Sequence, residues 1–424
     1  MSILRTCLAS LTTIFVSMHS VFAQEAPVTP PDTAIELYVD ADFTLNAPSA
    51  AAIELGIRSA LHLSGDRIAG QPVRLIRRDH AGNVRRSHQT LQEAAENPNV
   101  LAVFGGLHSP PYLQHGSDVN ASGLPLLLPW SAAGALTRLS SGDSNFIFRL
   151  SVDDTKATKF LITEAVDEGG CKAPALLLLD TGWGHFAHDK MMAELDAKGI
   201  RPAHIGFITV GLGRVSAKAI ANEVVRSKAD CAIMLANAGE GSLITEALAQ
   251  TATGKLDLYS HWGIASDDFS KSTSVAAREK LHLRVLQTCN VASHVSASDR
   301  LEEALAAARA VDPSRDLTDL SELPANVGFV HAFDLTRILI AAADQASFDD
   351  RWQEGIKSRR VALKEALEGL HAPVDGVMDL YAPPFAPSSA QEPDAHEALG
   401  TRHLCFAQFT PDGRLPWSIR TDAQ

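Results

Sequence analysis

Aromatic residues make up only 6% of this sequence, and only five of its 424 residues are cysteines. No segment after residue 23 reaches about 18 apolar residues, so the rest of the chain offers no candidate for direct insertion into a membrane. The formal net charge of −13 makes nucleic acids and anionic membrane surfaces poor partners. What remains is a chain long enough for two α/β domains with ordinary apolar cores.

The motifs of several enzyme classes are missing as well. There is no Gly-x-Ser-x-Gly nucleophile elbow, no Gly-x4-Gly-Lys-Ser/Thr phosphate loop, no His-Glu-x-x-His and no Cys-x-x-Cys. His185 and His188 lie three residues apart on a predicted helix, beside Asp189, but a chance pair is expected in a chain with 16 histidines. The sequence therefore predicts no enzyme, no metal site and no cofactor.

The first 23 residues have the pattern of an export signal. Arg5 supplies a positive start, residues 7–16 are apolar apart from small hydroxyl residues, and Ala23 provides a small residue at the cleavage position. Residues 24–33, rich in proline, are predicted to be a flexible leader. We therefore expect the mature chain in the periplasm.

Four cysteines remain after cleavage, and an exported protein can oxidise them. Four cysteines permit three pairings. Cys171 precedes one predicted strand and Cys231 opens another, and the two strands are neighbours in a doubly wound sheet of order 2-1-3. This placement favours a Cys171–Cys231 bond and leaves Cys289–Cys405, with four free buried thiols as the alternative.

Predicted strands and helices alternate twice along the chain, with a break near residue 150. In the first run, strands are predicted at 35–39, 73–77, 100–104 and 125–128, with helices at 49–64, 84–96 and 112–122. In the second run, strands are predicted at 175–179, 203–208, 231–235 and 256–259, with helices at 155–168, 185–198, 216–227 and 241–251. Strands that alternate with helices of this length indicate parallel sheets.

Two loops place tryptophans where ligands commonly bind. Residues 124–137, LPLLLPWSAAGALT, put Trp130 directly after a strand, and residues 180–184, DTGWG, do the same for Trp183. In open α/β sheets, ligands bind beyond the carboxyl ends of the strands. One such site in each half of the chain suggests two lobes that face each other across a cleft.

The order of these segments resembles the type I periplasmic binding proteins, in the branch that binds leucine, isoleucine and valine for ABC importers. The matching stretches are VLAVFGGLHS at 100–109, residues 124–137, FIFRLSVDD at 146–154, LLDTGWG at 178–184, GFVHAFDLTRILIAAA at 328–343 and residues 374–378. The resemblance covers roughly residues 35–376.

The resemblance implies two doubly wound lobes joined by three crossovers. The first lobe would comprise residues 34–149 and 290–371, and the second residues 150–289 with the C-terminal hinge and hairpin, 372–424. Closure of the lobes would capture a small amino-acid-like or carboxylate ligand, which a membrane permease and its ATPase would then import. The alternative is a periplasmic sensor of the same fold, coupled to a membrane signalling receptor.

Five candidate ligand-binding residues lie in the first half: Asp42, Ser109, Trp130, Ser131 and Ala132. Ser109 stands at a helix entry, where free N–H groups attract a carboxylate, although a plain N-cap serine is the alternative. Ala132 replaces a threonine that helps to bind the ligand's amino group in the family, and Ser131 is expected to take over that hydrogen bond. Trp130 is expected to fill the pocket or stack on the ligand, and Asp42 lies at the predicted cleft rim.

Three further candidates lie in the second half. Trp183 stands where the resemblance implies a tyrosine that covers the ligand, and its ring offers a rigid apolar wall. Asn237 follows the predicted strand 231–235 and Trp262 the predicted strand 256–259, and both are expected to face the cleft. Arg214 is predicted to be a solvated surface residue, and Arg149 to bond hinge backbone.

Overall fold

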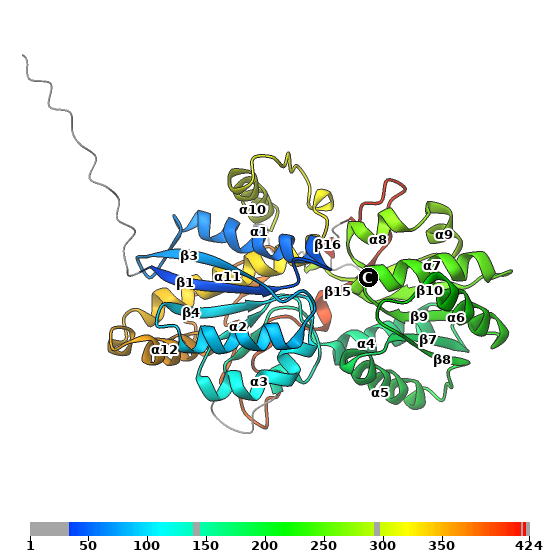
Figure 1. The fold of residues 1–424 in the computed structure, drawn as a ribbon, viewed down its shortest axis with the longest axis horizontal. Coiled ribbons are helices and arrows are strands. Elements are labelled where there is room, and N and C mark those ends of the chain that lie inside the picture. Colours follow the sequence, from blue (N-terminus) through cyan, green and yellow to red (C-terminus); the bar gives the residue numbers. More distant parts are fainter. Residues whose placement is uncertain (1–33, 139–144, 292–296, 417–418, 421–424) are drawn as a thin grey trace, which may run out of the picture. The chain divides into compact units, whose positions relative to one another are not determined.

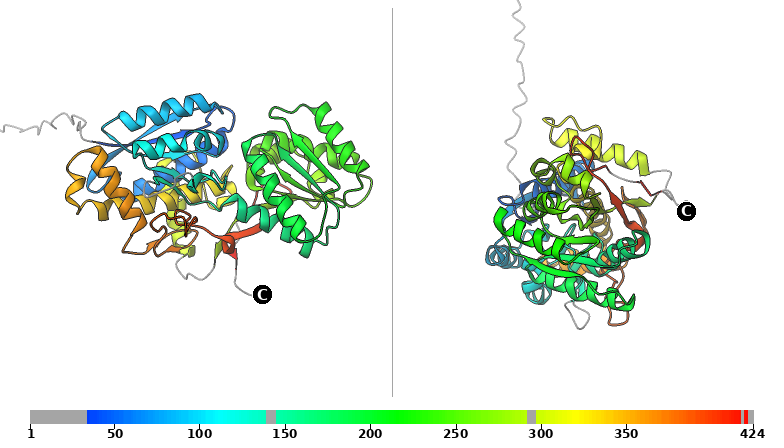
Figure 2. Two further views of the ribbon diagram at one scale, coloured as in Figure 1. Left: turned by 90° about the horizontal axis from the view of Figure 1, so that it is seen from below. Right: turned by 90° about the vertical axis from the view of Figure 1, so that its right-hand side faces the viewer.

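The computed structural model describes residues 34–138, 145–291, 297–416 and 419–420. The predicted signal peptide and leader, residues 1–33, lie outside these residues. Two six-stranded sheets organise the described chain, each with helices on both of its faces (Figures 1 and 2). The predicted α/β fold with two lobes built on parallel sheets is confirmed.

The first sheet has the strand order β2-β3-β1-β4-β5-β6. Its strands are β1 (Ile35–Ala41), β2 (Arg67–Ile68), β3 (Gln71–Asp79), β4 (Val100–Gly105), β5 (Leu126–Leu128) and β6 (Ile147–Arg149). All neighbours are parallel except β2 and β3. Every residue of β1 and β4 is buried, as expected for parallel strands covered on both faces.

The helices of the same part of the chain are α1 (Ala47–Leu63), α2 (Val84–Glu96), α3 (Pro110–Ser122), α10 (Ala297–Val311), α11 (Asn326–Ala346) and α12 (Ile356–Glu368). By length and composition α11 alone among the described helices could span a membrane, but 83% of its apolar window is buried. It packs closely on α1, because Gly56 brings the α1 backbone against the carbonyl oxygen of Phe329. Helix α11 is therefore a core helix.

The second sheet has the order β15-β11-β10-β9-β7-β8. Its strands are β7 (Pro174–Leu179), β8 (His204–Ile208), β9 (Cys231–Leu235), β10 (Asp257–Ser260), β11 (Arg284–Thr288) and the antiparallel edge strand β15 (Leu404–Ala407). Its helices are α4 (Asp154–Thr163), which continues as a π-helical turn (Glu164–Glu168), α5 (Gly182–Ala197), α6 (Arg214–Arg226), α7 (Ala238–Thr251), α8 (Asp267–Ser272) and α9 (Val275–Lys280).

Short elements complete the fold. They are the strands β12 (Asn290–Val291), β13 (Val374–Asp375), β14 (Leu380–Tyr381) and β16 (Ile419–Arg420), and five 3-10 turns, η1 (Leu136–Arg138), η3 (Trp262–Ile264), η4 (Leu320–Glu322), η5 (Asp350–Trp352) and η6 (Thr401–His403). The strands β13 and β14 pair antiparallel and form a hairpin.

Both sheets reverse their strand order at one place, and this sets where a ligand would bind. In the first sheet β1 lies between β3 and β4, and in the second β7 lies between β8 and β9. The loops that follow β1 and β4 diverge to opposite faces of the first sheet, and those after β7 and β9 do the same in the second. A crevice opens at such a switch point, beyond the carboxyl ends of the strands.

The cysteines pair as the strand order favours. The Cys171–Cys231 disulfide joins the start of β7 to the start of β9, where Pro174 and Cys231 are in register. The Cys289–Cys405 disulfide joins the end of β11 to β15. The bonds close loops of 60 and 116 residues, and loops of that size correspond to roughly 4–5 kcal/mol each in the chain-entropy model.

The segment 381–398 is rich in proline and charge, yet several of its side chains lie in the interior. Phe385 and His396 are buried, and Glu397 forms a buried ion pair with Arg149. Arg149 also donates to the carbonyl oxygen of Ala133 at 2.8 Å, so its backbone partner lies in the loop after β5. The polar residues of the segment therefore hold the end of β6 and this loop together from inside.

Candidate functional site

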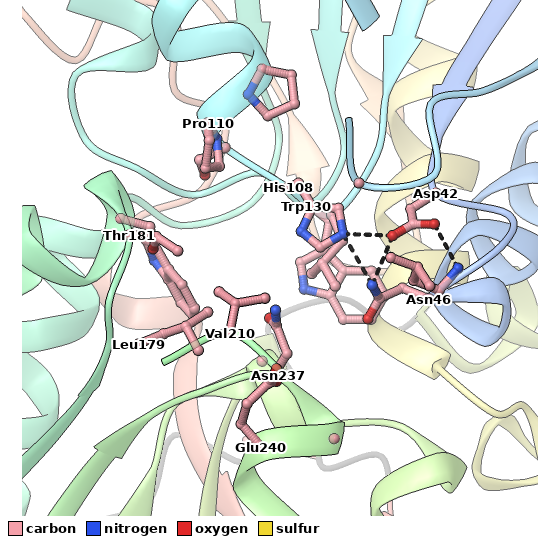
Figure 3. A pocket seen from close by; sticks show the side chains of 18 of the residues that line it. Asp42, Asn46, His108, Pro110, Trp130, Leu179, Thr181, Val210, Asn237 and Glu240 are labelled. Carbon is pink, nitrogen blue, oxygen red and sulfur yellow. Dashed lines mark hydrogen bonds and ion pairs between the residues drawn. The ribbon is translucent and has the colours of Figure 1, made fainter. Parts of the chain in front are cut away.

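A cavity of about 410 Å³ lies at the two switch points and is lined by residues from both sheets. This volume falls in the range of small-molecule pockets. Figure 3 shows Asp42, Asn46, His108 and Trp130 on one side and Leu179, Thr181, Val210, Asn237 and Glu240 on the other. The first group follows β1, β4 and β5, and the second follows β7, β8 and β9.

Seven of the eight predicted ligand-binding residues line this cavity: Asp42, Ser109, Trp130, Ala132, Trp183, Asn237 and Trp262. The structure therefore brings residues together that are up to 220 positions apart in the sequence. Arg214 is exposed and is not among the lining residues, as expected of a surface arginine.

Ser131 is the exception, because it lies behind the cavity wall. Its side chain is fully buried, and its hydroxyl lies 2.7 Å from the carbonyl oxygen of Gly106 and 3.0 Å from that of His108. A hydroxyl has one proton, and these carbonyls take it. Ser131 therefore holds the loop after β4 in place, and the expected substitution for the missing threonine at Ala132 is not supported.

The N-terminus of α3 offers fewer donors than expected at Ser109. Pro110 and Pro111 occupy the first two positions of the helix, and proline has no N–H. The hydroxyl oxygen of Ser109 accepts from the N–H of Ala133 at 3.2 Å. Helix entries usually attract anions through three or four free amides. Two of those amides are absent here, which removes most of the carboxylate cradle predicted at this helix.

Asp42 is instead the main charged group on this side of the cavity. Its carboxylate accepts from the backbone N–H of Leu45 at 2.7 Å, from Asn46 Nδ2 at 2.9 Å and from His108 Nε2 at 3.1 Å (Figure 3). Burial by itself raises the pKa of Asp42, but the bonds from His108, Asn46 and Leu45 outweigh burial and hold the pKa well below its usual range. Asp42 is therefore charged at every physiological pH.

Across the cavity, one buried carboxylate orients two of the lining rings. Asp154 has no exposed surface, and it accepts from Trp183 Nε1 at 2.6 Å and from His261 Nε2 at 2.9 Å. The rings of Trp183 and His261 meet edge to face with centroids 5.2 Å apart. Asp154 is not among the residues predicted from the sequence. It is the last residue of the FIFRLSVDD stretch and the first residue of α4, and this position is the signal by which it could have been found.

Two ring nitrogens at the cavity make no hydrogen bond within the part of the chain that the structure describes. They are Trp130 Nε1 and His261 Nδ1, and both residues are almost completely buried. Gly328 of α11 fixes the Trp130 ring, since a Cβ at that position would lie 2.4 Å from Cζ3. Both nitrogens are shielded from solvent, and a buried polar group without a partner is costly.

The α7 end of the cavity supplies backbone donors. Asn237 precedes α7 and makes no capping bond with its side chain, so the first amides of the helix have no acceptor there. Glu240 lies in the first turn and accepts from the N–H of Gly211 at 2.9 Å. Among the described lining residues the acidic side chains are Asp42 and Glu240, and none is lysine or arginine. The acidic groups of the lining are therefore these two carboxylates, and the carboxylate of Asp42 is paired with His108.

The predicted chance pair of histidines stays apart from any ligand cluster. His185 contacts Asp180 and His188 contacts Asp189, and both histidine rings also pack on Phe207. Neither belongs to a group of three or more potential metal ligands among the described residues.

Comparisons with known proteins identify the fold. A family model described as periplasmic binding protein matches residues 41–277. No curated protein matches the sequence. A leucine-binding protein of Thermotoga maritima is 15% identical, with a TM-score of 0.65 over 82% of this chain and 90% of that one.

Two further solved structures are similar to the same extent. A solute-binding protein of an ABC transporter from Rhodopseudomonas palustris, in complex with p-hydroxybenzoic acid, is 16% identical, with a TM-score of 0.71 over 91% of this chain and 96% of that one. A branched-chain amino acid transporter substrate-binding protein from Streptococcus pneumoniae, in complex with isoleucine, is 13% identical, with a TM-score of 0.70 over 90% and 97%. At these identities the likeness concerns the fold.

Proposed function

The chain belongs to the periplasmic binding protein family, and from this premise we propose that it is the solute-binding component of an ABC importer. The observation that carries the proposal is the cavity at the two switch points, walled by Trp130 on one side and Trp183 on the other. In this proposal residues 1–23 are removed on export, and the mature protein delivers its ligand in the periplasm to a membrane permease driven by an ATPase.

We further propose that residues 34–149 with 290–371 form one lobe and residues 150–289 with 372–424 the other. The lobes would close on the ligand about the three crossovers. Binding then depends on the contacts that the closed form adds to those of the open form. The contribution of both sheets to the cavity lining supports this mechanism.

The ligand that we propose is a small amphipathic molecule with a flat or branched apolar part. The tryptophan rings offer rigid apolar surface that loses little entropy on binding. The related structures contain isoleucine and p-hydroxybenzoic acid, one an amino acid and the other an aromatic carboxylate. Both classes, amino-acid-like and carboxylate, are therefore candidates by size.

The charge of the cavity favours the amino-acid-like class over a plain carboxylate. Asp42 is charged, Glu240 adds a second carboxylate, and the prolines of α3 remove amide donors on the same side. An anion without a compensating cation would meet like charge in a partly desolvated site. An ammonium group would be attracted to Asp42, and a carboxylate would find backbone donors at the start of α7.

Matched trios of ligands test this proposal on the mature protein, residues 24–424. L-Phenylalanine, 2-phenylethylamine and 3-phenylpropionate share a ring and a spacer but differ in charge, and leucine, isoamylamine and 4-methylpentanoate form an aliphatic trio. A ligand at about 100 times its dissociation constant adds roughly 2.7 kcal/mol of stability, which thermal shift detects and calorimetry then quantifies. We expect the carboxylate to be the weakest member of each trio.

Two variants locate the binding. Trp183→Ala removes a cavity wall and should abolish the shift, whereas Phe348→Ala, which removes an aromatic side chain that is 91% exposed and absent from the lining, should leave it unchanged. A carboxylate that binds best and depends on Trp183 would refute the charge argument and leave the importer proposal standing. Ligands that bind equally well to Trp183→Ala would refute the cavity itself.

A further inference from the structure

Three potential metal ligands meet on helices α2 and α3, away from the cavity described above. They are His88 on α2 and His115 and Asp118 on α3, and none of them lines the cavity. One ring nitrogen of each histidine and a carboxylate oxygen of Asp118 lie within 4.8 Å of one another. Asp118 Oδ2 is 3.3 Å from His88 Nε2 and 3.7 Å from His115 Nδ1.

These separations suit a tetrahedral ion with short bonds. Zinc bonds to histidine nitrogen and carboxylate oxygen are about 2.0–2.2 Å, so neighbouring ligand atoms of a tetrahedron lie roughly 3.3–3.6 Å apart. The two measured separations are within a few tenths of an ångström of this range. A set of two imidazoles and one carboxylate suits zinc and the neighbouring divalent transition metals better than calcium or magnesium.

The helices hold the three groups without help from loops. His115 and Asp118 are three residues apart, which places them on the same face of α3. His88 comes from α2, which packs directly on α3. The two histidines are 27 positions apart in the sequence, so they do not form a short sequence motif. The sequence alone therefore gives no indication of a metal site here.

One property of the cluster favours a metal over an ordinary ion pair. His88 Nε2 is shielded from solvent and makes no hydrogen bond with a described residue. The carboxylate of Asp118 remains 63% exposed, so water can complete the coordination sphere.

One rearrangement is required. The two imidazole rings are stacked, with centroids 3.8 Å apart and planes 2° from parallel. In parallel rings the nitrogen lone pairs point side by side, so one ring must turn about its Cβ–Cγ bond before both can bind the same ion. The side chains are 29% and 13% exposed, so both rings lie partly at the helix surface.

From this geometry we propose that His88, His115 and Asp118 form a binding site for a divalent transition-metal ion of the zinc class. The ion would join α2 to α3 by two imidazole nitrogens and one carboxylate oxygen. The site is separate from the ligand cavity and does not depend on the importer proposal.

Titration of the metal-free mature protein with zinc chloride, followed by calorimetry, tests the site. We expect one zinc ion per chain. Asp118→Asn and His115→Ala should each weaken binding by about tenfold or more. The matched control is His185→Ala with His188→Ala, which removes two histidines three residues apart on one helix and should leave the affinity unchanged.

Spectroscopy separates this site from non-specific binding. Cobalt(II) should give the intense visible bands of a four-coordinate ion in the wild type and lose them in His115→Ala. The exposed Asp118→Asn change leaves the fold intact, so its effect is readable even if a histidine variant unfolds. No zinc binding by the wild type, or zinc binding that survives both Asp118→Asn and His115→Ala, would overturn the proposal.

Discussion

The removal of Asp154 is expected to uncouple two walls of the ligand cavity. Asp154 is fully buried and accepts one hydrogen bond from Trp183 Nε1 and one from His261 Nε2. Asp154→Ala leaves both N–H groups without this acceptor. Trp183 is only partly buried and its N–H can turn to water, whereas His261 has no exposed surface and its N–H stays unpaired.

The structure allows the cost to be estimated. A hydrogen bond to a charged group contributes about 1.5–3 kcal/mol, and a buried donor without a partner costs about 1–3 kcal/mol. Because one of the two donors regains water, we expect Asp154→Ala to lower the free energy of unfolding by roughly 3 kcal/mol. Asp154→Asn should cost less than half as much, since its oxygen still accepts from Trp183 and its amide can donate to His261 Nε2.

The Asp154→Asn variant also changes the chemistry of the cavity. If the introduced amide donates to His261 Nε2, the imidazole proton must reside on Nδ1, which then becomes a donor toward the cavity instead of an acceptor. We therefore expect Asp154→Asn to shift ligand preference toward compounds that present an acceptor there. The change should be visible in calorimetry with the matched trios.

Urea unfolding, followed by circular dichroism and tryptophan fluorescence, measures these differences. Asp180→Ala is the matched control, because this exposed carboxylate also accepts from a histidine, His185, at 2.9 Å. Its loss should cost no more than about 0.5 kcal/mol, as exposed pairs usually do. Equal stability of Asp154→Ala and the wild type, or an equal loss in Asp180→Ala, would refute the reasoning.

Two further predictions concern the core beneath the cavity. Gly328→Ala places a Cβ 2.4 Å from the Trp130 ring and should lower the free energy of unfolding by about 1–3 kcal/mol. Gly239→Ala is the control, because a Cβ there would have nothing within 4 Å, and it should be neutral or slightly stabilising in the same urea assay. Equal stability of the two variants would contradict the packing argument. Burial lowers the pKa of His331 to about 3 in the folded protein. Below about pH 6.5 this histidine therefore binds a proton in the unfolded chain but stays neutral in the folded one, and the free energy of unfolding falls as the pH falls. His331→Gln should remove this contribution. As the pH falls from about 6 to 4, the stability of the variant relative to the wild type should rise by up to about 1.4 kcal/mol per pH unit. A stability difference that does not change with pH would refute the prediction.

Several features of the fold were predictable because they depend on local patterns. The buried strands β1, β4, β7 and β9 are short apolar runs between turn residues, and each lies within one or two residues of its predicted bounds. Helices were also recognised, but α3, α5 and α7 begin two or three residues earlier than predicted. Their first turns contain glycine, proline or tryptophan, which do not show helical periodicity.

The roles of single side chains were less predictable, since they depend on partners distant in the sequence. Ser131 and Ala132 are adjacent, but only Ala132 reaches the cavity, because carbonyls of the loop after β4 bind the Ser131 hydroxyl. Asp154 gained its importance from Trp183 and His261, which lie 29 and 107 residues away.

By itself the sequence determined the alternation of strands and helices, the two sheets, the favoured cysteine pairs and the loops in which a ligand site would form. These follow from hydrophobic periodicity and from the rule that parallel strands end at one edge. The tertiary structure alone decided which polar groups face the cavity, the pairing of Asp42 with His108 and the meeting of His88 with His115. Hydrogen-bond partners and burial are set by packing between distant segments, and one sequence does not contain that information in a local form.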